Sequence, residues 1–434
     1  MRLKLINRLV LAISYLVLIV AILTVPLLLQ AQAAPSSPAF YLHDGDTVVF
    51  YGDSITEQRY YTQWVATYVA TRFPHMRVRF FNEGFGGDRV SGGAAGPIDL
   101  RLTRDLFPDK PTVVTIMLGM NDGSYTRLTP EIESRYTEGY EHILTSIQQK
   151  LPNVRLVLFG PSPYDEITRP EMFPGGYNTT LTHFSDLDRD LAHKHNATFI
   201  DLNAPFVAGL KKGAAINPLA TELLLPDRVH PEPLAHWFMA EAILKGWNAP
   251  AIVSSVTIDA ATHSTIDAQN AKVTELSGDA TALSWTELDG ALPLPIDDKN
   301  AGIHFVRQLI DLDKNLDQQP LTIVGLKPGS YELTIDGHLI GTFPYTDLAK
   351  GINLALLNTP MRGQANTVNW EVRDLESTHF VRMRMFEAQV KAGYTPEPGA
   401  SDLIKFEQYQ QNRIYELNQP KPHTFVIRTA TTPQ

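Results

Sequence analysis

Alternating strand and helix patterns between residues 44 and 250 constrain the fold of this chain more than any other feature. The run 112–118 is β-branched and almost wholly apolar, as expected of a strand buried on both faces. Further strands are predicted at 47–51, 78–81, 154–159 and 198–201, and helices at 61–73, 131–150, 181–195 and 236–247. Five strands separated by helices predict an α/β domain with a parallel five-stranded sheet and helices on both faces.

The pattern changes after Pro250, where short strands with Gly or Pro between them predict a β-rich accessory domain at 252–375. Asp336-Gly337 separates two alternating runs, which is a strong hairpin signal. Residues 376–434 are predicted to form a C-terminal helical and extended tail. Its helix, 401–417, is expected to begin at a Ser401 or Asp402 cap. The change of pattern also predicts that the α/β and β-rich domains have separate cores.

The first 33 residues have the features of an export signal. Residues 1–8 are basic, residues 9–29 are uncharged, and Ala31-Gln32-Ala33 is the small-x-small pattern that a signal peptidase reads. Cleavage is predicted after Ala33. The apolar run is also long enough to cross a bilayer, so an uncleaved N-terminal anchor is the alternative. Either outcome places the rest of the chain outside the cytoplasm, secreted or periplasmic, with no other membrane attachment.

Charge and composition exclude several classes of function. The net charge of the 434 residues is −10 with no basic stripe, which argues against a nucleic-acid partner. The chain has no cysteine, which excludes disulfides, thiolate nucleophiles and cysteine-ligated zinc. The acidic segment 311–317 resembles the start of a calcium loop. However, Leu316 stands where glycine is needed and Thr322 where glutamate is needed, so we expect a solvated acidic turn and no metal.

Chemistry-bearing residues follow the predicted strands, at the edge of the sheet where ligands bind. Gly52-Asp53-Ser54-Ile55 ends the first strand and exposes a serine on a tight turn, which suits a nucleophile; alternatively, it is a turn that caps a helix. A glycine-rich loop at 82–88 follows the second strand. Asn121, after the third strand, can donate to an oxyanion or cap the next turn.

Asp227 and His230 lie three residues apart on one loop after the fifth strand. An aspartate at this spacing can orient the imidazole and leave its second nitrogen free to take a proton from Ser54. A surface turn with no catalytic role is the alternative for such a pair taken alone. Four blocks in this order, each predicted near a strand end, favour the catalytic interpretation.

Together these blocks resemble the SGNH hydrolases, the GDSL-type esterases and lipases, over residues 44–250. The resemblance implies a flavodoxin-like three-layer α/β/α domain and the activity of a carbohydrate acetylesterase-like member. Two departures from the family pattern are Ile55, where leucine is commoner, and Arg228-Val229, where small residues are frequent. Neither departure changes a catalytic atom.

The family pattern also implies a role for each matching residue. Ser54 is the nucleophile, His230 the base and Asp227 the residue that orients it. The N–H groups of Ser54 and Gly87 and the side-chain amide of Asn121 form the oxyanion hole. No metal or cofactor is needed, and no substrate-binding residue or oligomeric state is assigned.

The resemblance predicts an exported serine esterase whose substrate is an acetylated carbohydrate. Five aromatic residues near the blocks suit a sugar, because sugars stack on rings, although they are equally expected in the core. These residues are Tyr60, Tyr61, Trp64, Tyr125 and Trp237. The alternatives are a lipase or short-chain acyl esterase, and a non-catalytic carbohydrate-binding protein on a hydrolase scaffold.

Overall fold

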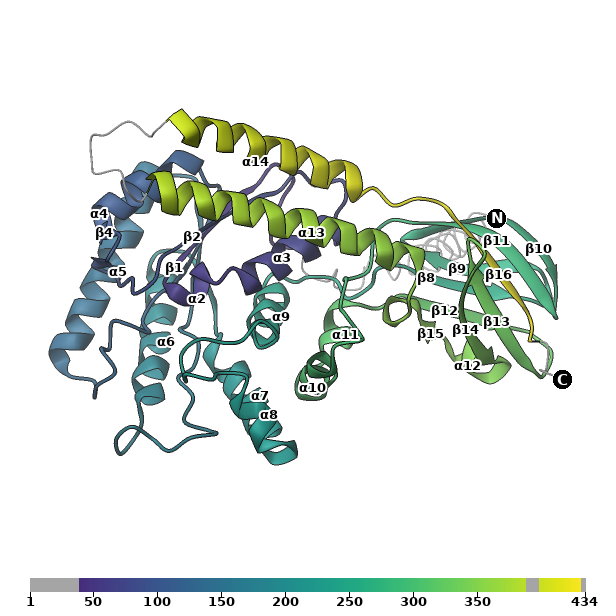
Figure 1. Ribbon diagram of the computed structural model, residues 1–434, viewed down its shortest axis with the longest axis horizontal. Coiled ribbons are helices and arrows are strands. Elements are labelled where there is room, and N and C mark those ends of the chain that lie inside the picture. The colour runs from purple at the N-terminus through teal and green to yellow at the C-terminus, as the bar shows by residue number, and fades with distance from the viewer. Residues whose placement is uncertain (1–38, 388–397, 431–434) are drawn as a thin grey trace, which may run out of the picture. The chain divides into compact units, whose positions relative to one another are not determined.

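The predicted parallel sheet is present as five strands in the computed structural model (Figure 1). The strands lie in the order β2-β1-β5-β6-β7 and are all parallel. Their bounds are β1 (Thr47–Gly52), β2 (Arg79–Gly84), β5 (Val113–Met117), β6 (Arg155–Phe159) and β7 (Thr198–Ile200). This is the flavodoxin-like order, in which ligands bind beyond the carboxyl ends of the strands near the β1–β5 junction. The predicted α/β/α fold class is confirmed.

The structure describes residues 39–387 and 398–430. The predicted signal peptide, its cleavage point after Ala33 and the alternative anchor lie outside these residues. None of the helices in the described ranges is both long and apolar enough to cross a membrane. The described residues from Tyr41 onward belong to one compact unit.

Helices cover both faces of the sheet. The connection from β1 to β2 runs toward one edge of the sheet, whereas the later connections to β5, β6 and β7 run toward the other edge. Because such connections are right-handed, α3 lies on one face of the sheet and α5 and α6 lie on the opposite face. Helix α9 packs against α3, and α5 packs against α6. The bounds are α2 (Ser54–Glu57), α3 (Tyr60–Arg72), α4 (Ile98–Arg101), α5 (Pro130–Lys150), α6 (Tyr177–Lys194), α7 (Asn203–Ile216), α8 (Pro218–Glu222) and α9 (His236–Gly246).

A β-rich region follows the α/β region, as predicted. One sheet has the antiparallel order β10-β11-β16-β13-β14, and a second has the order β15-β12-β8-β9. The bounds are β8 (Ser255–Asp259), β9 (Ser264–Gln269), β10 (Ala271–Asp279), β11 (Ala282–Asp289), β12 (Pro320–Val324), β13 (Ser330–Ile335), β14 (His338–Pro344), β15 (Ile352–Asn353) and β16 (His423–Thr429). Asp336 and Gly337, both at positive φ, form the predicted hairpin turn between β13 and β14.

The remaining elements are mostly helices. They are β3 (Gly92–Gly93), β4 (Gly96–Pro97), α10 (Ala301–Leu309), α11 (Leu312–Leu316), α12 (Tyr345–Lys350), α13 (Pro360–Val381) and α14 (Pro398–Leu417), with a π-helical turn at 382–387. Helices α13 and α14 run side by side, and α13 also packs on α3 (Figure 1). The predicted domain boundary at residue 375 falls inside α13, and β16 of the predicted tail lies between β11 and β13.

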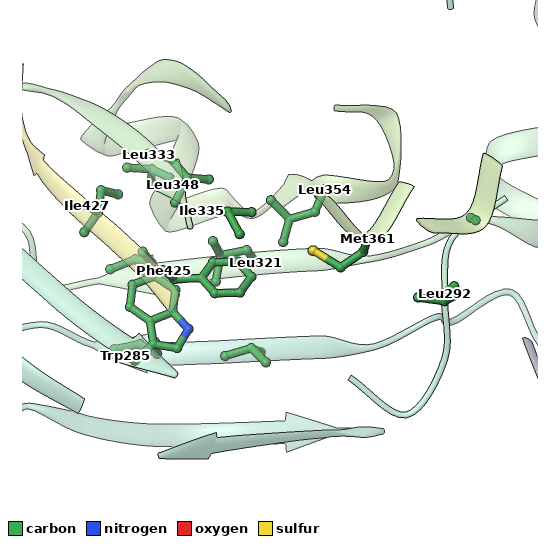
Figure 2. Packing of buried hydrophobic residues seen from close by; sticks show 14 of the residues in the cluster. Trp285, Leu292, Leu321, Leu333, Ile335, Leu348, Leu354, Met361, Phe425 and Ile427 are labelled. Atoms are coloured by element: carbon green, nitrogen blue, oxygen red, sulfur yellow. The ribbon is translucent and has the colours of Figure 1, made fainter. Parts of the chain in front are cut away.

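The prediction of separate cores is wrong. One buried cluster runs from the β-rich region to α3, where it includes Ala66, and Phe80 of β2 packs against it. Within the β-rich region, Trp285 stacks on Phe425, with ring centroids 5.1 Å apart (Figure 2). The same cluster includes Met361 of α13. Helix α13 therefore joins the two regions through apolar contacts that the local sequence pattern does not reveal.

Two further predictions are corrected. Residues 398–400 are already helical in α14, so Ser401 and Asp402 lie inside the helix and do not cap its start. The inner face of α14 carries Glu407, whose carboxylate pairs with Arg382 (2.7 Å). The segment 311–317 is not a solvated turn but contains α11, whose Leu312 and Leu316 are buried. Asp317, which follows α11, is also buried and pairs with Arg72 of α3 (3.4 Å).

Candidate active site

Ser54 lies immediately beyond the carboxyl end of β1, at the first position of α2. Asp53 caps this helix, because its Oδ1 accepts a hydrogen bond from the Ile55 N–H (3.0 Å). A Cβ at Gly52 would lie 2.2 Å from Thr56 Oγ1 and 2.8 Å from the Met117 carbonyl oxygen. Only glycine fits this turn between strand and helix, which leaves the Ser54 side chain half-buried at the sheet edge.

The structure brings Asp227, His230 and Ser54 into one chain of hydrogen bonds. Asp227 Oδ2 lies 2.6 Å from His230 Nδ1, and His230 Nε2 lies 2.8 Å from Ser54 Oγ. With the Nδ1 proton on the aspartate side, Nε2 is free to accept the serine proton. The arrangement has the geometry of an activated nucleophile, a base and a group that orients the base.

The loop that carries Asp227 holds its carboxylate in place. Asp227 Oδ1 accepts hydrogen bonds from the backbone N–H of Val229 (2.9 Å) and of His230 (2.8 Å). Arg228 adopts a positive φ of 74° to make this turn, and its side chain donates to the Pro170 carbonyl oxygen (2.6 Å). Partial burial raises the pKa of Asp227, but the hydrogen bonds from His230 and Val229 outweigh it and lower the pKa below its usual range. Asp227 is therefore favoured in its ionised, carboxylate form beside His230.

The glycine-rich loop after β2 borders Ser54. A Cβ on Gly86 would lie 4.0 Å from Ser54 Cβ, and Gly87 has a positive φ of 76°. Asn121, after β5, donates from Nδ2 to the Asp88 carbonyl oxygen (3.0 Å) and approaches Asp53 Oδ2 at 3.4 Å. The candidate oxyanion residues Ser54, Gly87 and Asn121 thus come from the ends of three adjacent strands.

The orientation of the Asn121 amide is set by Tyr125, whose hydroxyl donates to Asn121 Oδ1 (3.3 Å). The contact turns Nδ2 toward the loop that carries Gly87. The sequence suggests the Tyr125 ring for sugar stacking, and the structure also gives the Tyr125 hydroxyl a role in positioning Asn121.

Buried charged side chains hold the glycine-rich loop in place. Asp88 accepts from Arg101 Nε (2.9 Å), and Arg101 Nη2 donates to the Glu83 carbonyl oxygen (2.6 Å). Asp122 accepts from the N–H groups of Gly119 and Val90, both at 3.0 Å, and so ties the loop after β2 to the loop after β5. Burial raises the pKa of Asp122 to about 6. The loop positions are therefore held by groups without solvent access.

Gln58 and His236 support the loop that carries His230. Neither residue was identified from the sequence. Gln58 Nε2 donates to the carbonyl oxygen of Pro231, the residue after His230 (3.2 Å). His236 Nε2 lies 3.1 Å from the same oxygen and 3.2 Å from Gln58 Oε1. Burial lowers the pKa of His236 to about 3, so its ring is neutral. The only sequence signal for Gln58 is its position four residues after Ser54, on the same short helical segment.

The C-terminal helices also contact the site. Arg384 Nη2 pairs with Glu57 of α2 (3.1 Å), and its guanidinium lies over the ring of Phe85 in the glycine-rich loop. His379 Nε2 lies 2.8 Å from Glu83 Oε1 at the end of β2. These contacts join residues that are far apart in the chain; His379 and Glu83, for example, are separated by 296 positions. No local sequence pattern could therefore predict them.

The five aromatic residues near the blocks divide between core and surface. Tyr61 and Trp237 are fully buried, whereas Tyr60 is exposed and Trp64 and Tyr125 are half-buried. Trp64 stacks on Trp237 with centroids 4.2 Å apart. The core interpretation therefore holds for two of the five, and the other three are available to a ligand.

Among the described residues, one group has donor atoms close enough to hold a metal: Glu83, Asp109 and His379, within 4.8 Å of one another. Arg382 lies beside it, with Nη2 2.8 Å from His379 Nδ1 and 3.9 Å from Asp109 Oδ1. The guanidinium supplies positive charge to Asp109, and Glu83 pairs with His379 (2.8 Å), so the group is best described as an ion-pair network between β2 and the C-terminal helices.

Comparisons with known proteins show what the chain is similar to. Residues 50–238 match the GDSL-like lipase/acylhydrolase family. An acetylxylan esterase from Geobacillus stearothermophilus is 26% identical over 219 residues, which are 46% of this chain and 93% of that protein. The structure of BT4096, a gut microbial diltiazem-metabolizing enzyme, aligns with a TM-score of 0.78 and 26% identity over 91% of this chain and 99% of that one. The crystal structure of Axe2, the Geobacillus acetylxylan esterase, aligns over 48% of this chain and 96% of its own, with 25% identity and a TM-score of 0.38.

The fold and these matches define a hydrolase that acts on carboxylic ester bonds. Through its α/β region, the chain is similar to the GDSL-like lipase/acylhydrolase family, also called the SGNH hydrolases, and to an acetylxylan esterase.

Proposed function

We propose that the protein is an exported serine esterase that removes acetyl groups from a carbohydrate through an acyl-enzyme. The observation that carries this proposal is the hydrogen-bond chain from Asp227 through His230 to Ser54 Oγ. Attack of Ser54 Oγ on the acetyl carbonyl carbon transfers the serine proton to His230 Nε2. Asp227, whose pKa is lowered, stabilises the imidazolium that forms.

The oxyanion of the tetrahedral intermediate would be met by the N–H groups of Ser54 and Gly87 and by Asn121 Nδ2. His230 then gives its proton to the leaving sugar hydroxyl, and the acetyl group stays on Ser54. Water attacks this ester while His230 takes a proton from it, acetate leaves, and the proton returns to Ser54 Oγ. Apart from the substrate and the attacking water, every step uses backbone and side-chain groups of this chain.

The carbohydrate substrate is supported by the similarity to an acetylxylan esterase and by the accessible rings of Tyr60 and Trp64. Export is supported by the basic and apolar pattern of residues 1–33. N-terminal sequencing of the protein recovered outside the cytoplasm tests export, because cleavage after Ala33 yields a chain that begins at Ala34. A chain that begins at Met1 would support the anchor instead.

The nucleophile is tested with Ser54→Ala and with Ser134→Ala, an exposed serine on α5, as the matched control. We expect Ser54→Ala to abolish hydrolysis of 4-nitrophenyl acetate and acetate release from acetylated xylooligosaccharides, with a native circular dichroism spectrum. A serine-directed phosphonate should label the peptide that contains Ser54 and no other. A Ser54→Ala variant that retains more than about a tenth of kcat would exclude Ser54 as nucleophile, because its loss should cost several orders of magnitude.

A second candidate is an esterase for small molecules. It is favoured by the alignment with the diltiazem-metabolizing enzyme, which covers both the α/β and the β-rich regions. The two candidates differ in the ratio of kcat/KM on acetylated xylooligosaccharides to kcat/KM on small acetyl esters. A carbohydrate esterase should prefer the oligosaccharide, and a small-molecule esterase should prefer the small ester.

A further inference from the structure

A cleft of about 630 Å³ lies where the α/β region meets the β-rich region. It is lined by residues of α3, α9 and α13 and of the segments 295–300 and 356–358. Figure 1 shows α3 beside α13, and the two helices pack together. No residue of the hydrogen-bonded Ser54–His230–Asp227 set lines this cleft.

Two accessible tryptophans line the cleft, one from each of two helices that pack together. Trp370 on α13 is 56% exposed, which is unusual for so large an apolar side chain. Trp64 on α3 is half-buried and is held by its stack on the buried Trp237. Indole rings offer large, flat apolar faces with little conformational entropy to lose, as binding of pyranose rings requires.

Polar side chains with free hydrogen-bonding groups lie beside these rings. Within the described residues, the side-chain amides of Asn358 and Asn366 make no hydrogen bond, and both line the cleft. Each amide offers two donors and an acceptor, which is the pattern that sugar hydroxyls satisfy. Exposed Asp297 and Lys299 add one charge of each sign, so the cleft favours a neutral ligand over an ionic one.

The walls of the cleft are held in place by neighbouring residues. Asn369, next to Trp370, accepts hydrogen bonds from Gln63 and Thr67 of α3, both at 2.9 Å, and so fixes α13 on the α/β region. Arg362 of α13 pairs with Asp298, which anchors the segment 295–300. A preformed cleft loses little entropy on binding.

The cleft is within reach of the active site. Leu234 lines it and is only four residues after His230, so their Cα atoms are at most about 14 Å apart. We infer that this cleft binds unmodified sugar units of the carbohydrate chain whose acetyl group is cleaved at Ser54. The inference rests on the proposed function and assigns the junction with the β-rich region a role in substrate binding.

The test compares Trp370→Ala with Tyr409→Ala, a control on α14 whose ring is 61% exposed outside the cleft. Xylohexaose without acetyl groups is titrated calorimetrically into Ser54→Ala, which binds without turnover, and into Ser54→Ala combined with each substitution. We expect Trp370→Ala to raise the Kd about tenfold, equivalent to about 1.4 kcal/mol, and Tyr409→Ala to leave it unchanged. On otherwise wild-type protein, Trp370→Ala should raise KM for acetylated xylooligosaccharides and leave hydrolysis of 4-nitrophenyl acetate unchanged.

Absence of xylohexaose binding, or an equal Kd with and without Trp370, would overturn the inference. Neither result affects hydrolysis of 4-nitrophenyl acetate, whose absence in the wild-type protein would instead contradict the proposed esterase. Because Trp370 is exposed, its replacement should not unfold the protein, and an unchanged melting temperature checks this. Asn366→Ala provides a second variant, for which the same direction of change is expected.

Discussion

Arg384 lies over the ring of Phe85, with its guanidinium carbon 3.7 Å from the ring centroid. Phe85 belongs to the loop that carries Gly87, and Arg384 also pairs with Glu57 of α2, the helix that begins at Ser54. One residue of the C-terminal region therefore contacts both the loop and the helix that would bind the oxyanion. Removing residues after 250 would remove this support.

Arg384→Ala should lower kcat on 4-nitrophenyl acetate about two- to thirtyfold, because a partly buried cation–π contact is worth about 0.5–2 kcal/mol. Arg384→Lys should lose less, since a lysine can still pair with Glu57. The control is Arg373→Ala, because Arg373 is exposed and, among the described residues, its side chain forms an ion pair only with its neighbour Asp374. Equal activity of Arg384→Ala and Arg373→Ala in steady-state assays would show that the contact does not position the loop.

Asn121→Ala should lower kcat by about 10²–10³ with a smaller change in KM, because its amide would stabilise charge that develops only in the transition state. Tyr125→Phe should lower kcat by at most about tenfold, because it removes only the hydrogen bond that orients the amide. The measurement is steady-state kinetics on a small acetyl ester. A raised KM with unchanged kcat in Asn121→Ala would place this residue in ground-state substrate binding.

His236 should make stability depend on pH. Its pKa is about 3 in the folded protein and 6.5 when exposed, so between these values only the unfolded chain takes up the proton. This histidine therefore favours unfolding increasingly as the pH falls from 6.5 toward 3, by about 1.4 kcal/mol per pH unit. Above pH 6.5 it has no such effect.

The test is urea unfolding of the wild type and of His236→Gln, whose amide can still donate toward the Pro231 carbonyl. The stability difference between the two should be constant from pH 7 to 8 and should shift in favour of the variant as the pH falls below 6.5. Parallel curves through pH 5 would show that His236 is protonated in the folded protein.

A protein truncated to residues 35–250 should be much less stable than the full chain. It keeps every proposed catalytic residue but loses Asp317, the buried partner of Arg72, and breaking such a pair typically costs about 3–5 kcal/mol. It also uncovers the face of α3 that packs on α13. Thermal unfolding followed by circular dichroism measures the effect, and a truncated protein with the melting temperature of the full chain would contradict it.

Local patterns in the sequence determined the strands of the parallel sheet, the hairpin at Asp336-Gly337 and the four blocks that place Ser54, Gly87, Asn121, Asp227 and His230. Each depends on neighbours within a few residues: an apolar run between turns, an Asp-Gly pair between alternating runs, or a polar residue just after a strand. The order of the blocks along a parallel sheet also predicted that they meet at one edge, because the strands of such a sheet end on the same side.

Tertiary structure alone decided how the C-terminal region is used. Glu407 lies on the inner face of α14 because Arg382 and His379 neutralise it there, whereas its sequence reads as a solvent-facing charge. Strand β16 pairs with β11 and β13, more than 80 residues away in the chain. Likewise, Gln58 supports the loop of His230, and Arg384 reaches Phe85. Sequence periodicity shows which neighbouring residues can be buried together. The positions of these side chains and of β16 depend instead on distant partners, which neutralise a charge, contact a ring or pair with the edge of a strand.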